Sequence, residues 1–208
     1  MTGKSAENGQ KDRLILGLSG ASGVSLGIRL LEAVKDLRLE SHLVMSKAAE
    51  MTIGYETSLK PKEVAAKADY AYAVGDIAAP IASGTFKTRG MAIAPCSVRT
   101  MSEIATGVTT TLLTRAADVC LKERRPLVLL VRETPLHLGH LRTMTQLAEM
   151  GAIILPPVPA FYAAPHTLDD MVDQIVARAL DLLGYDWQKA RRWGEDVAKS
   201  RRKPKARK

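Results

Sequence analysis

Residues 14–23 read LILGLSGASG, and a helical pattern begins directly after them. An apolar run followed by a turn of small residues predicts a buried parallel strand that leads into a helix. Such a turn leaves backbone N–H groups free at the start of the helix, where these groups and the helix dipole favour an anion. The segment therefore predicts that a phosphate-bearing ligand lies near Ser22. The alternative is a tight strand-to-helix turn that binds nothing.

The glycine spacing in this turn favours a mononucleotide over a dinucleotide. The glycines stand at 17, 20 and 23, as Gly-x-x-Gly-x-x-Gly, whereas dinucleotide-binding turns have Gly-x-Gly-x-x-Gly. The next apolar run ends at Met45 and Ser46 without an Asp or Glu that could bind a ribose. We therefore expect FMN in preference to NAD.

Apolar runs alternate with helical patterns along the whole chain. The runs are residues 14–18, 42–45, 91–94, 127–131 and 152–155, and the main helical patterns are 24–38, 109–123, 138–150 and 167–183. This alternation predicts an α/β fold, a flavodoxin-like or Rossmann-like three-layer sandwich with a parallel sheet and helices on both faces. Residues 57–90 are less regular, with a short helix expected to begin at Pro61. Residues 186–198, which include Trp187 and Trp193, predict a terminal helix.

The length and the charge distribution indicate one domain with a basic tail. The chain has 208 residues, and we expect a single domain over 13–198 between two disordered segments, 1–12 and 199–208. Seven of the last ten residues are Lys or Arg, and without them the net charge falls from +8 to +1. None of the nine aromatic residues is interleaved with this basic run. The basicity is thus confined to a tail, and we expect no nucleic-acid partner.

Membrane, disulfide and metal functions find no support in the sequence. No apolar run approaches the ~20 residues of a spanning helix, and residues 1–12 lack the apolar core of a secretory signal. The two cysteines, Cys96 and Cys120, are too few for a disulfide framework. His137 and His140 are three residues apart, but no third ligand stands beside them, so we expect no metal. These features predict a protein of the reducing cytoplasm.

Polar residues follow the apolar runs, and the carboxyl ends of parallel strands are where ligands bind. The residues that follow the five runs are Ser19 to Ser22, Ser46, Ser97, the pair Arg132 and Glu133, and, beyond two prolines, Phe161 and Tyr162. Because these ends share one edge of the sheet, we expect the side chains to line a single crevice.

Most of these residues also have a structural interpretation. The hydroxyls of Ser97 and Thr100 can donate to a ligand or can cap a helix, with Glu103 completing a Thr100-x-x-Glu103 capping box. Arg132 and Glu133 follow a buried strand, and they can pair with each other. We favour the alternative, in which Arg132 binds a ligand oxygen and Glu133 handles a proton.

A second set of polar residues stands farther along the chain. Tyr162 lies in a proline-rich loop and Arg178 in the helical pattern that follows, so the two can form a small anion clamp. Read alone, Arg178 is a solvated helix residue. Lys122 begins a basic patch that, on its own, is typical of a solvated helix end.

Eight motifs together resemble one known family. They are residues 17–23 (GLSGASG), 46–49 (SKAA), 81–84 (IASG), 95–97 (PCS), 114–118 (TRAAD), 122–126 (KERRP), 132–135 (RETP) and 159–162 (PAFY). In this combination the chain resembles the flavin prenyltransferases of the UbiX type over residues 13–193. That family makes the prenylated flavin used by UbiD-type decarboxylases.

The resemblance implies a fold, an assembly and a reaction. The fold is a flavodoxin-like parallel sheet, and the assembly is a homododecamer. Reduced FMN reacts with dimethylallyl phosphate without a metal: the allyl carbon bonds flavin N5, phosphate leaves, and a second bond forms at C6. The product, prenylated FMN, is expected to pass to a UbiD-type decarboxylase. The chain has no Asp-rich motif that could hold Mg²⁺ on a diphosphate, which agrees with a monophosphate donor.

The resemblance also implies roles for single residues. Those expected to hold FMN are Gly20, Ala21, Ser22, Ser46, Ser97, Val98, Arg99, Thr100 and Arg132. Those expected to bind dimethylallyl phosphate are Tyr162, Arg178, Lys122 and Trp193. Lys122 and Glu56 are expected to join the site from neighbouring subunits and to take part in catalysis. Ser22 and Glu133 are expected to assist proton movement at the flavin.

One position departs from the family, and two other functions compete. Ile77 stands where some members carry Trp, which affects the isoprenoid pocket rather than the flavin site. The first alternative is an FMN-dependent decarboxylase of the phosphopantothenoylcysteine type, whose Pro-Ala-Met-Asn loop and early His are missing here. The second is a flavin-carrying accessory subunit of an aromatic-acid decarboxylase, without turnover.

Overall fold

The structure is a computed structural model that describes residues 12–197. It contains a six-stranded sheet in the order β3-β2-β1-β4-β5-β6, and every strand pairing in it is parallel. The strands are β1 (Arg13–Leu18), β2 (Glu40–Met45), β3 (Tyr70–Tyr72), β4 (Met91–Cys96), β5 (Leu127–Val131) and β6 (Ile153–Ile154). The five predicted runs are all strands, which confirms the parallel α/β fold. Apart from Asp12, the two segments expected to be disordered lie outside the described residues.

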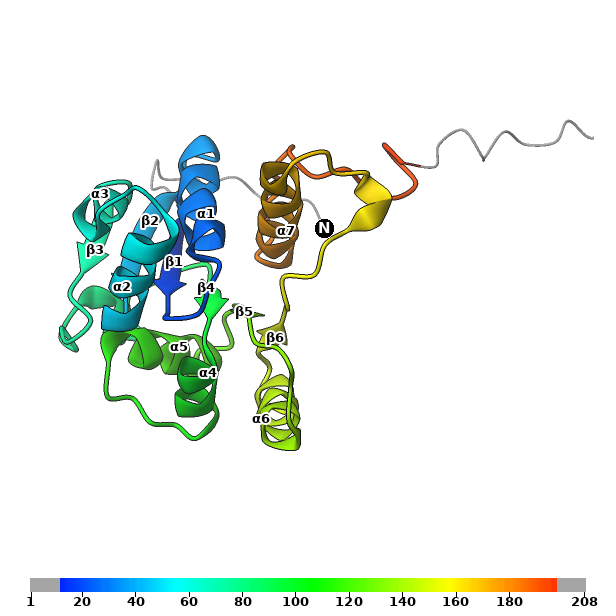
Figure 1. Ribbon diagram of the computed structural model, residues 1–208. Helices are drawn as coiled ribbons and strands as arrows, with labels where there is room; N and C mark the ends of the chain where they lie inside the picture. The colour runs from blue at the N-terminus through cyan, green and yellow to red at the C-terminus, as the bar shows by residue number, and fades with distance from the viewer. Residues whose placement is uncertain (1–11, 198–208) are drawn as a thin grey trace, which may run out of the picture.

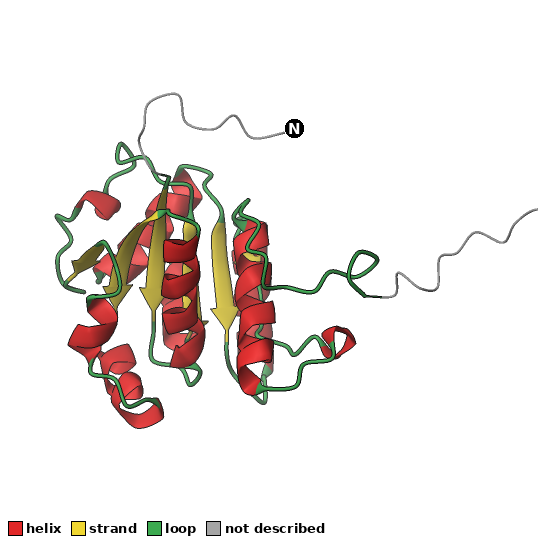
Figure 2. Ribbon diagram, turned by 90° about the horizontal axis from the view of Figure 1, so that it is seen from above, coloured by secondary structure: helices red, strands yellow, loops and turns green. Residues whose placement is uncertain are grey.

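Helices cover both faces of the sheet (Figures 1 and 2). One face packs against α1 (Val24–Asp36), α2 (Lys47–Glu56), α3 (Pro61–Ala65) and α7 (Leu168–Leu182). The other packs against α4 (Val98–Ala105), α5 (Leu112–Lys122), α6 (Leu138–Glu149) and the short turn η1 (Pro80–Ala82). A second short turn, η2 (Phe161–Ala163), lies in the connection from β6 to α7, which runs out from the sheet (Figure 1).

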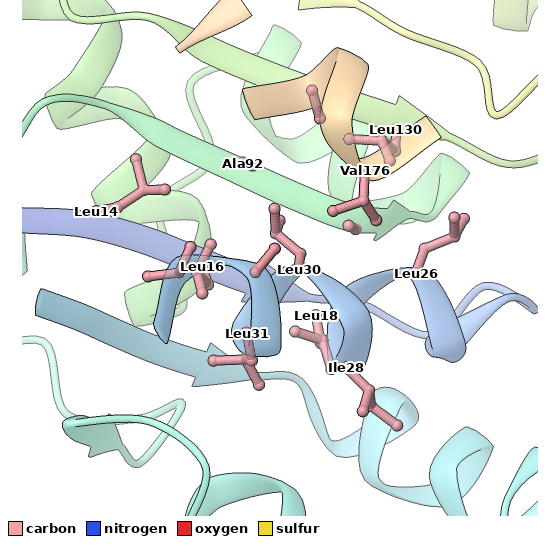
Figure 3. Close-up of a cluster of buried hydrophobic side chains, with 14 of the residues drawn as sticks. Leu14, Leu16, Leu18, Leu26, Ile28, Leu30, Leu31, Ala92, Leu130 and Val176 are labelled. Atoms are coloured by element: carbon pink, nitrogen blue, oxygen red, sulfur yellow. The ribbon is translucent and has the colours of Figure 1, made fainter. Parts of the chain in front are cut away.

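The core explains why the strands are continuous apolar runs. In β1, Leu14, Leu16 and Leu18 pack toward α1 and α7 (Figure 3), whereas Ile15 packs into the cluster on the opposite face. A strand covered on both faces has no solvent-facing positions, so its residues are apolar without alternation. Full burial of each such side chain contributes ~1.5–3 kcal/mol.

The helix α1 seats closely on the centre of the sheet. Its apolar residues recur at helical spacing and face the strands, including Leu26, Leu30 and Leu31 (Figure 3). At Gly27 the helix backbone approaches β4 so closely that a Cβ atom there would lie 2.2 Å from the carbonyl oxygen of Ala94. Only glycine permits this approach, which brings the N-terminal half of α1 directly over the boundary between β1 and β4.

That boundary is the topological switch point of the sheet. From β1 the chain adds β2 and β3 on one side, and then returns to add β4, β5 and β6 on the other. The helices that follow β1 and β4 therefore lie on opposite faces, and their connecting turns diverge at the carboxyl edge. Open parallel sheets bind ligands in the crevice at this point.

Two sequence expectations were wrong in the peripheral segments. The edge strand β3 was not foreseen, because it is only three residues long and its first two residues are exposed, so it leaves no buried apolar run. The terminal helix expected over 186–198 is absent from its described part, 186–197, which forms turns and an isolated bridge between Trp193 and Val197. Trp187 is nonetheless buried, and its indole N–H donates to Asp36. A loop therefore places Trp187 in the core. The short helix at Pro61 is confirmed as α3.

Candidate active site at the carboxyl edge of the sheet

Three helices begin at the carboxyl edge near the switch point, and each has a polar side chain at its N terminus. Helix α1 follows β1, α2 follows β2 and α4 follows β4. The first turn of any helix leaves N–H groups without a helical acceptor. What accepts from those groups differs between the three helices, and that difference locates the anion-binding part of the site.

The N terminus of α1 is occupied by Glu56, which comes from the end of α2 in the same chain. Its carboxylate accepts from the amides of Gly23 and Val24 at 2.8 and 3.0 Å and from the Ser22 hydroxyl. Burial raises the pKa of Glu56, but these donors and the nearby charge of Arg132 outweigh it and hold the pKa below its ordinary value. Two expectations are corrected. Glu56 reaches Ser22 within the same chain and needs no neighbouring subunit. The amides of Gly23 and Val24, which were expected to face a ligand phosphate, donate to Glu56.

The N terminus of α2 is capped by a hydroxyl instead. Ser46 accepts from the amide of Ala49 at 3.0 Å, which leaves the amides of Lys47 and Ala48 without an acceptor in the helix. The turn after β1 lies directly against this helix start, since a Cβ atom on Gly20 would fall 2.3 Å from the Cβ of Ala48. Gly20 is therefore required for the two turns to meet.

The N terminus of α4 repeats the arrangement of α2. Ser97 accepts from the amide of Thr100 at 3.2 Å, so the amides of Val98 and Arg99 are left without a helical acceptor. The expected capping box starting at Thr100 is wrong: Thr100 lies inside the helix, almost fully buried and bonded to Ser97. Glu103 instead pairs with Arg99 at 2.8 Å.

Arg132 and Glu133 lie directly after β5 at the same edge, and both are exposed. The two do not pair with each other. Glu133 accepts from the amide of Thr134 at 2.9 Å, and Arg132 forms no ion pair with any residue between 12 and 197. The charge of the Arg132 guanidinium also contributes to the lowered pKa of Glu56. The positive charge at the edge is thus available to an anionic ligand.

Three of the four residues expected to bind dimethylallyl phosphate line a separate pocket. Tyr162, Arg178 and Trp193 line a hollow of about 270 Å³ on the outer side of α7. The rings of Tyr162 and Trp193 meet edge to face with centroids 5.7 Å apart. Arg178 lies 3.6 Å from Asp181 and is mostly exposed. The structure therefore brings these three residues together, but none of the FMN-expected residues lines the same hollow.

Lys122 lies far from both groups within one chain. It ends α5, just before β5 begins, so it stands at the amino edge of the sheet, opposite Ser22 and Ser97. There its ammonium contacts Glu123, and it borders a hollow of about 650 Å³ with Arg124 and Arg125. Lys122 can reach a site at the carboxyl edge only if that site belongs to another copy of the chain.

Other reactive side chains contribute little to this edge. Burial raises the pKa of Cys96 and of Cys120 to about 12, so both thiols stay protonated and unreactive at neutral pH. His137 caps α6 through its Nδ1 atom, and its ring stacks on that of His140. Between residues 12 and 197, no three His, Cys, Asp or Glu side chains are grouped as metal ligands. No helix in that range is long and apolar enough to cross a membrane.

The donors at the switch point suit a flavin mononucleotide. The two hydroxyl-capped helix starts supply neutral donors, and the guanidinium of Arg132 supplies a positive one. A phosphate monoester accepts hydrogen bonds from both kinds of donor. Glycine and alanine in the β1 turn keep side chains out of the crevice, as a flat ring system requires. The expected roles of Val98 and Arg99 at FMN stay predictions; their backbone amides lie at the helix start, and the Arg99 side chain pairs with Glu103.

Comparisons with known proteins agree with this arrangement. The profile of the family described as Flavoprotein matches residues 2–180. Flavin prenyltransferase UbiX of Escherichia coli strain K12 is 60% identical over 170 residues, which cover 81% of this chain and 90% of that protein. The protein of the same name from Thauera aromatica is 51% identical over 193 residues, 91% of this chain and 100% of that protein. The chain belongs to the UbiX flavin prenyltransferase family.

Solved structures of UbiX proteins have the same fold. AnUbiX (PadA1), crystallised in complex with FMN and dimethylallyl pyrophosphate, superposes with a TM-score of 0.87 at 48% identity, covering 88% of this chain and 98% of that one. A dodecameric FMN-dependent UbiX-like decarboxylase from Escherichia coli O157:H7 gives a TM-score of 0.85 at 48% identity, covering 87% and 98%. The predicted flavodoxin-like fold and the resemblance to the UbiX family are confirmed.

Proposed function

We propose that this chain is a flavin prenyltransferase, which joins a dimethylallyl group to N5 and C6 of reduced FMN. The donor is dimethylallyl phosphate, whose C–O bond breaks as the bond to N5 forms. The observation that carries the proposal is the pair of hydroxyl-capped helix starts at the switch point, together with Arg132, which pairs with no acid in the part of the chain that the structure describes. These groups would hold the FMN phosphate and leave the ring system in the crevice beside Ser22 and Glu56. The UbiX relatives support the reaction class.

The residues around the ring would manage protons rather than bind charge. Closing the second ring moves a proton from C6 and adds one to the alkene, so a proton acceptor and donor must stand near the ring. Glu56 is a carboxylate with a lowered pKa, held by Ser22 and two amides, and is suited to remain ionised and orient Ser22. Glu133 is exposed and adjacent to Arg132, and is the group free to exchange the proton.

The donor-binding residues imply a site shared between subunits. Tyr162, Arg178 and Trp193 form one hollow, Lys122 lies at the opposite edge, and the flavin rim lies at the switch point. A closed assembly that places the Tyr162 hollow and Lys122 of other copies over the rim would complete the site. The dodecameric UbiX-like structure of Escherichia coli O157:H7 supports a dodecamer as this assembly.

The ionisation of the donor would rely on charged hydrogen bonds. Two cationic side chains and one phenol around a phosphate neutralise the leaving group as the C–O bond breaks. Reduced FMN would supply the electron pair at N5 that forms the new bond to the electrophilic allyl carbon. AnUbiX was crystallised with dimethylallyl pyrophosphate, so this chain is best tested with both the monophosphate and the pyrophosphate as donors.

The product's expected consumer and location follow from the same proposal. Prenylated FMN would pass to a UbiD-type decarboxylase, and the cytoplasm is the compartment in which flavin is kept reduced and both thiols stay free.

The decisive experiment is an anaerobic incubation of the protein with reduced FMN and dimethylallyl phosphate, followed by mass spectrometry of the flavin. We expect a flavin whose mass has increased by one five-carbon unit, with release of one phosphate per flavin. Glu133→Gln and Ser22→Ala should slow the reaction while flavin still binds. Flavin that binds but gains no mass would identify a carrier without turnover and refute the enzyme assignment.

A further inference from the structure

Ser19 was expected to line the crevice, but its buried side chain instead joins the two turns that flank the switch point. It directly follows β1 and is fully buried. Its hydroxyl donates to the carbonyl oxygen of Pro95 at 2.9 Å and accepts from the amide of Ser97 at 2.7 Å. Both partners belong to the turn between β4 and α4, so one hydroxyl group bridges the two walls of the crevice.

The hydroxyl takes the place of a backbone carbonyl in the strand ladder. In a parallel pair, a residue that donates its N–H to one residue accepts at its C=O from the residue two positions later. The ladder between β1 and β4 slips by one residue here, because Ile15 donates to Gly90 whereas Ser19 donates to Pro95. Continued from the Ser19 pair, the ladder would send the amide of Ser97 to the Ser19 carbonyl. It goes to the Ser19 hydroxyl instead, and the released carbonyl accepts from Ala21 at 2.9 Å.

This exchange shapes both walls at once. The freed carbonyl of Ser19 closes the turn that carries Ala21 and Ser22, so β1 can end while β4 continues. The hydroxyl fixes the backbone of Ser97, whose own side chain caps α4. We infer that Ser19 is a positioning residue for the flavin, which sets the distance between the β1 turn and the amides at the start of α4. The inference rests on the proposed flavin site.

Ser41 provides a matched control in the same sheet. It is also a buried serine, only 3% exposed, and its hydroxyl also makes two bonds: it donates to the Asp69 carboxylate and accepts from the Asp69 amide, both at 2.8 Å. These bonds tie β2 to the residue before β3 at the amino edge, away from the crevice. Loss of either hydroxyl removes a similar bridge, but only one bridge borders the flavin.

The experiment compares Ser19→Ala with Ser41→Ala in the full-length protein. The dissociation constant of FMN is measured by flavin fluorescence, the unfolding midpoint by urea titration, and KM and kcat by the mass-spectrometric assay. We expect Ser19→Ala to raise the FMN dissociation constant and the KM for FMN at least tenfold, with kcat at saturating FMN within threefold of wild type. Ser41→Ala should lower the unfolding midpoint comparably and leave the FMN dissociation constant within twofold.

An FMN dissociation constant that Ser19→Ala leaves within twofold, or that both variants raise equally, overturns the positioning role. If Ser19→Ala does not fold, Ser19→Cys keeps the volume with a weaker donor and acceptor, and an increase of at least threefold in the FMN dissociation constant is then expected, whereas no change contradicts the inference. The binding measurement needs no turnover. A wild-type protein that binds FMN without prenylating it therefore refutes the proposed function and leaves this inference standing.

Discussion

The N terminus of α1 and those of α2 and α4 look equivalent in the sequence but differ in charge. All three helices begin after a strand, at one edge, with small polar residues. Helix α1 already donates its first amides to the carboxylate of Glu56, whereas Ser46 and Ser97 cap their helices with neutral hydroxyls and leave two amides free in each. A phosphate placed at α1 would meet a carboxylate, and one placed at α2 or α4 would not.

The difference shows how one edge of the sheet can bind a phosphate at some helix starts and keep a carboxylate for proton transfer at another. A phosphate beside Glu56 would raise the pKa of its carboxyl, because like charges disfavour the ionised form. In the structure, Ser22, the amides of Gly23 and Val24, and Arg132 hold that pKa below its ordinary value. A phosphate held at α2 and α4, as proposed, would leave this arrangement undisturbed. The comparison makes four predictions, which test the packing of α1, the caps of α2 and α4, and the carboxylate.

The largest expected effect concerns the packing that fixes α1 over the switch point. Gly27→Ala places a Cβ 2.2 Å from the backbone oxygen of Ala94, and overpacking of this kind costs ~3 kcal/mol because neither backbone can move aside. Gly54, in α2, has no atom within 4 Å of an added Cβ, so Gly54→Ala should stabilise the protein by ~0.5–1 kcal/mol. Urea unfolding measures both. Equal effects of the two substitutions would show that α1 is not closely seated.

The second prediction tests the hydroxyl caps as the phosphate site. The double variant Ser46→Ala, Ser97→Ala removes the two hydroxyl groups that fix the helix starts beside the free amides. At about 1 kcal/mol for each lost hydrogen-bonding group, it should weaken FMN binding roughly thirtyfold. Thr167→Ala is the control, because Thr167 caps α7 through the amide of Asp170 in the same manner. Titration of flavin fluorescence should show an unchanged affinity for Thr167→Ala. Equal losses in both proteins would mean that the caps act only through stability.

The third prediction separates the carboxylate from flavin binding. Glu56→Gln keeps the shape and an acceptor for Gly23 and Val24 but removes the charge. We expect the FMN dissociation constant to change by less than twofold and turnover to fall at least tenfold, about 1.4 kcal/mol in the barrier. Single-turnover measurements at saturating FMN test this. A large gain in FMN affinity would instead place the phosphate at α1, where the carboxylate had repelled it.

Sequence patterns predicted the framework of the molecule better than its contacts. The five strands covered on both faces were evident because burial on two sides forces continuous apolar runs, as at Leu14 to Leu18. The switch-point crevice followed from parallel topology, and Ser46 and Ser97 were found because hydroxyls stand directly after strands. The resemblance to the UbiX family supplied the reaction and most site residues, which no periodicity could have given.

The misses share a physical cause, since each depends on a contact between distant segments. The interaction of Glu56 with Gly23 joins residues 33 apart, and that of Ser19 with Ser97 joins residues 78 apart. Neither leaves a local pattern. Trp187 shows the same limit: a terminal helix was predicted around it, but a loop places it in the core through contacts with distant residues such as Asp36. A serine at the end of a buried strand is the one signal that could have pointed to Ser19.

The smallest effect is the acid sensitivity of the α1 start. The pKa of Glu56 is lower in the folded chain than its ordinary value of 4.5, so its contribution to stability is fully present above that pH and is lost as the pH falls through the folded-state pKa. Since the carboxylate is exposed, solvent screening limits this contribution to about 1 kcal/mol. The difference in unfolding free energy between wild type and Glu56→Gln should therefore be constant from pH 7 to pH 5 and shrink below pH 4.5. Carboxyl groups common to both proteins cancel in this difference. A gap that stays constant down to pH 3 would mean that the carboxylate's charge does not stabilise α1, and the contrast with α2 and α4 would then rest on hydrogen bonding alone.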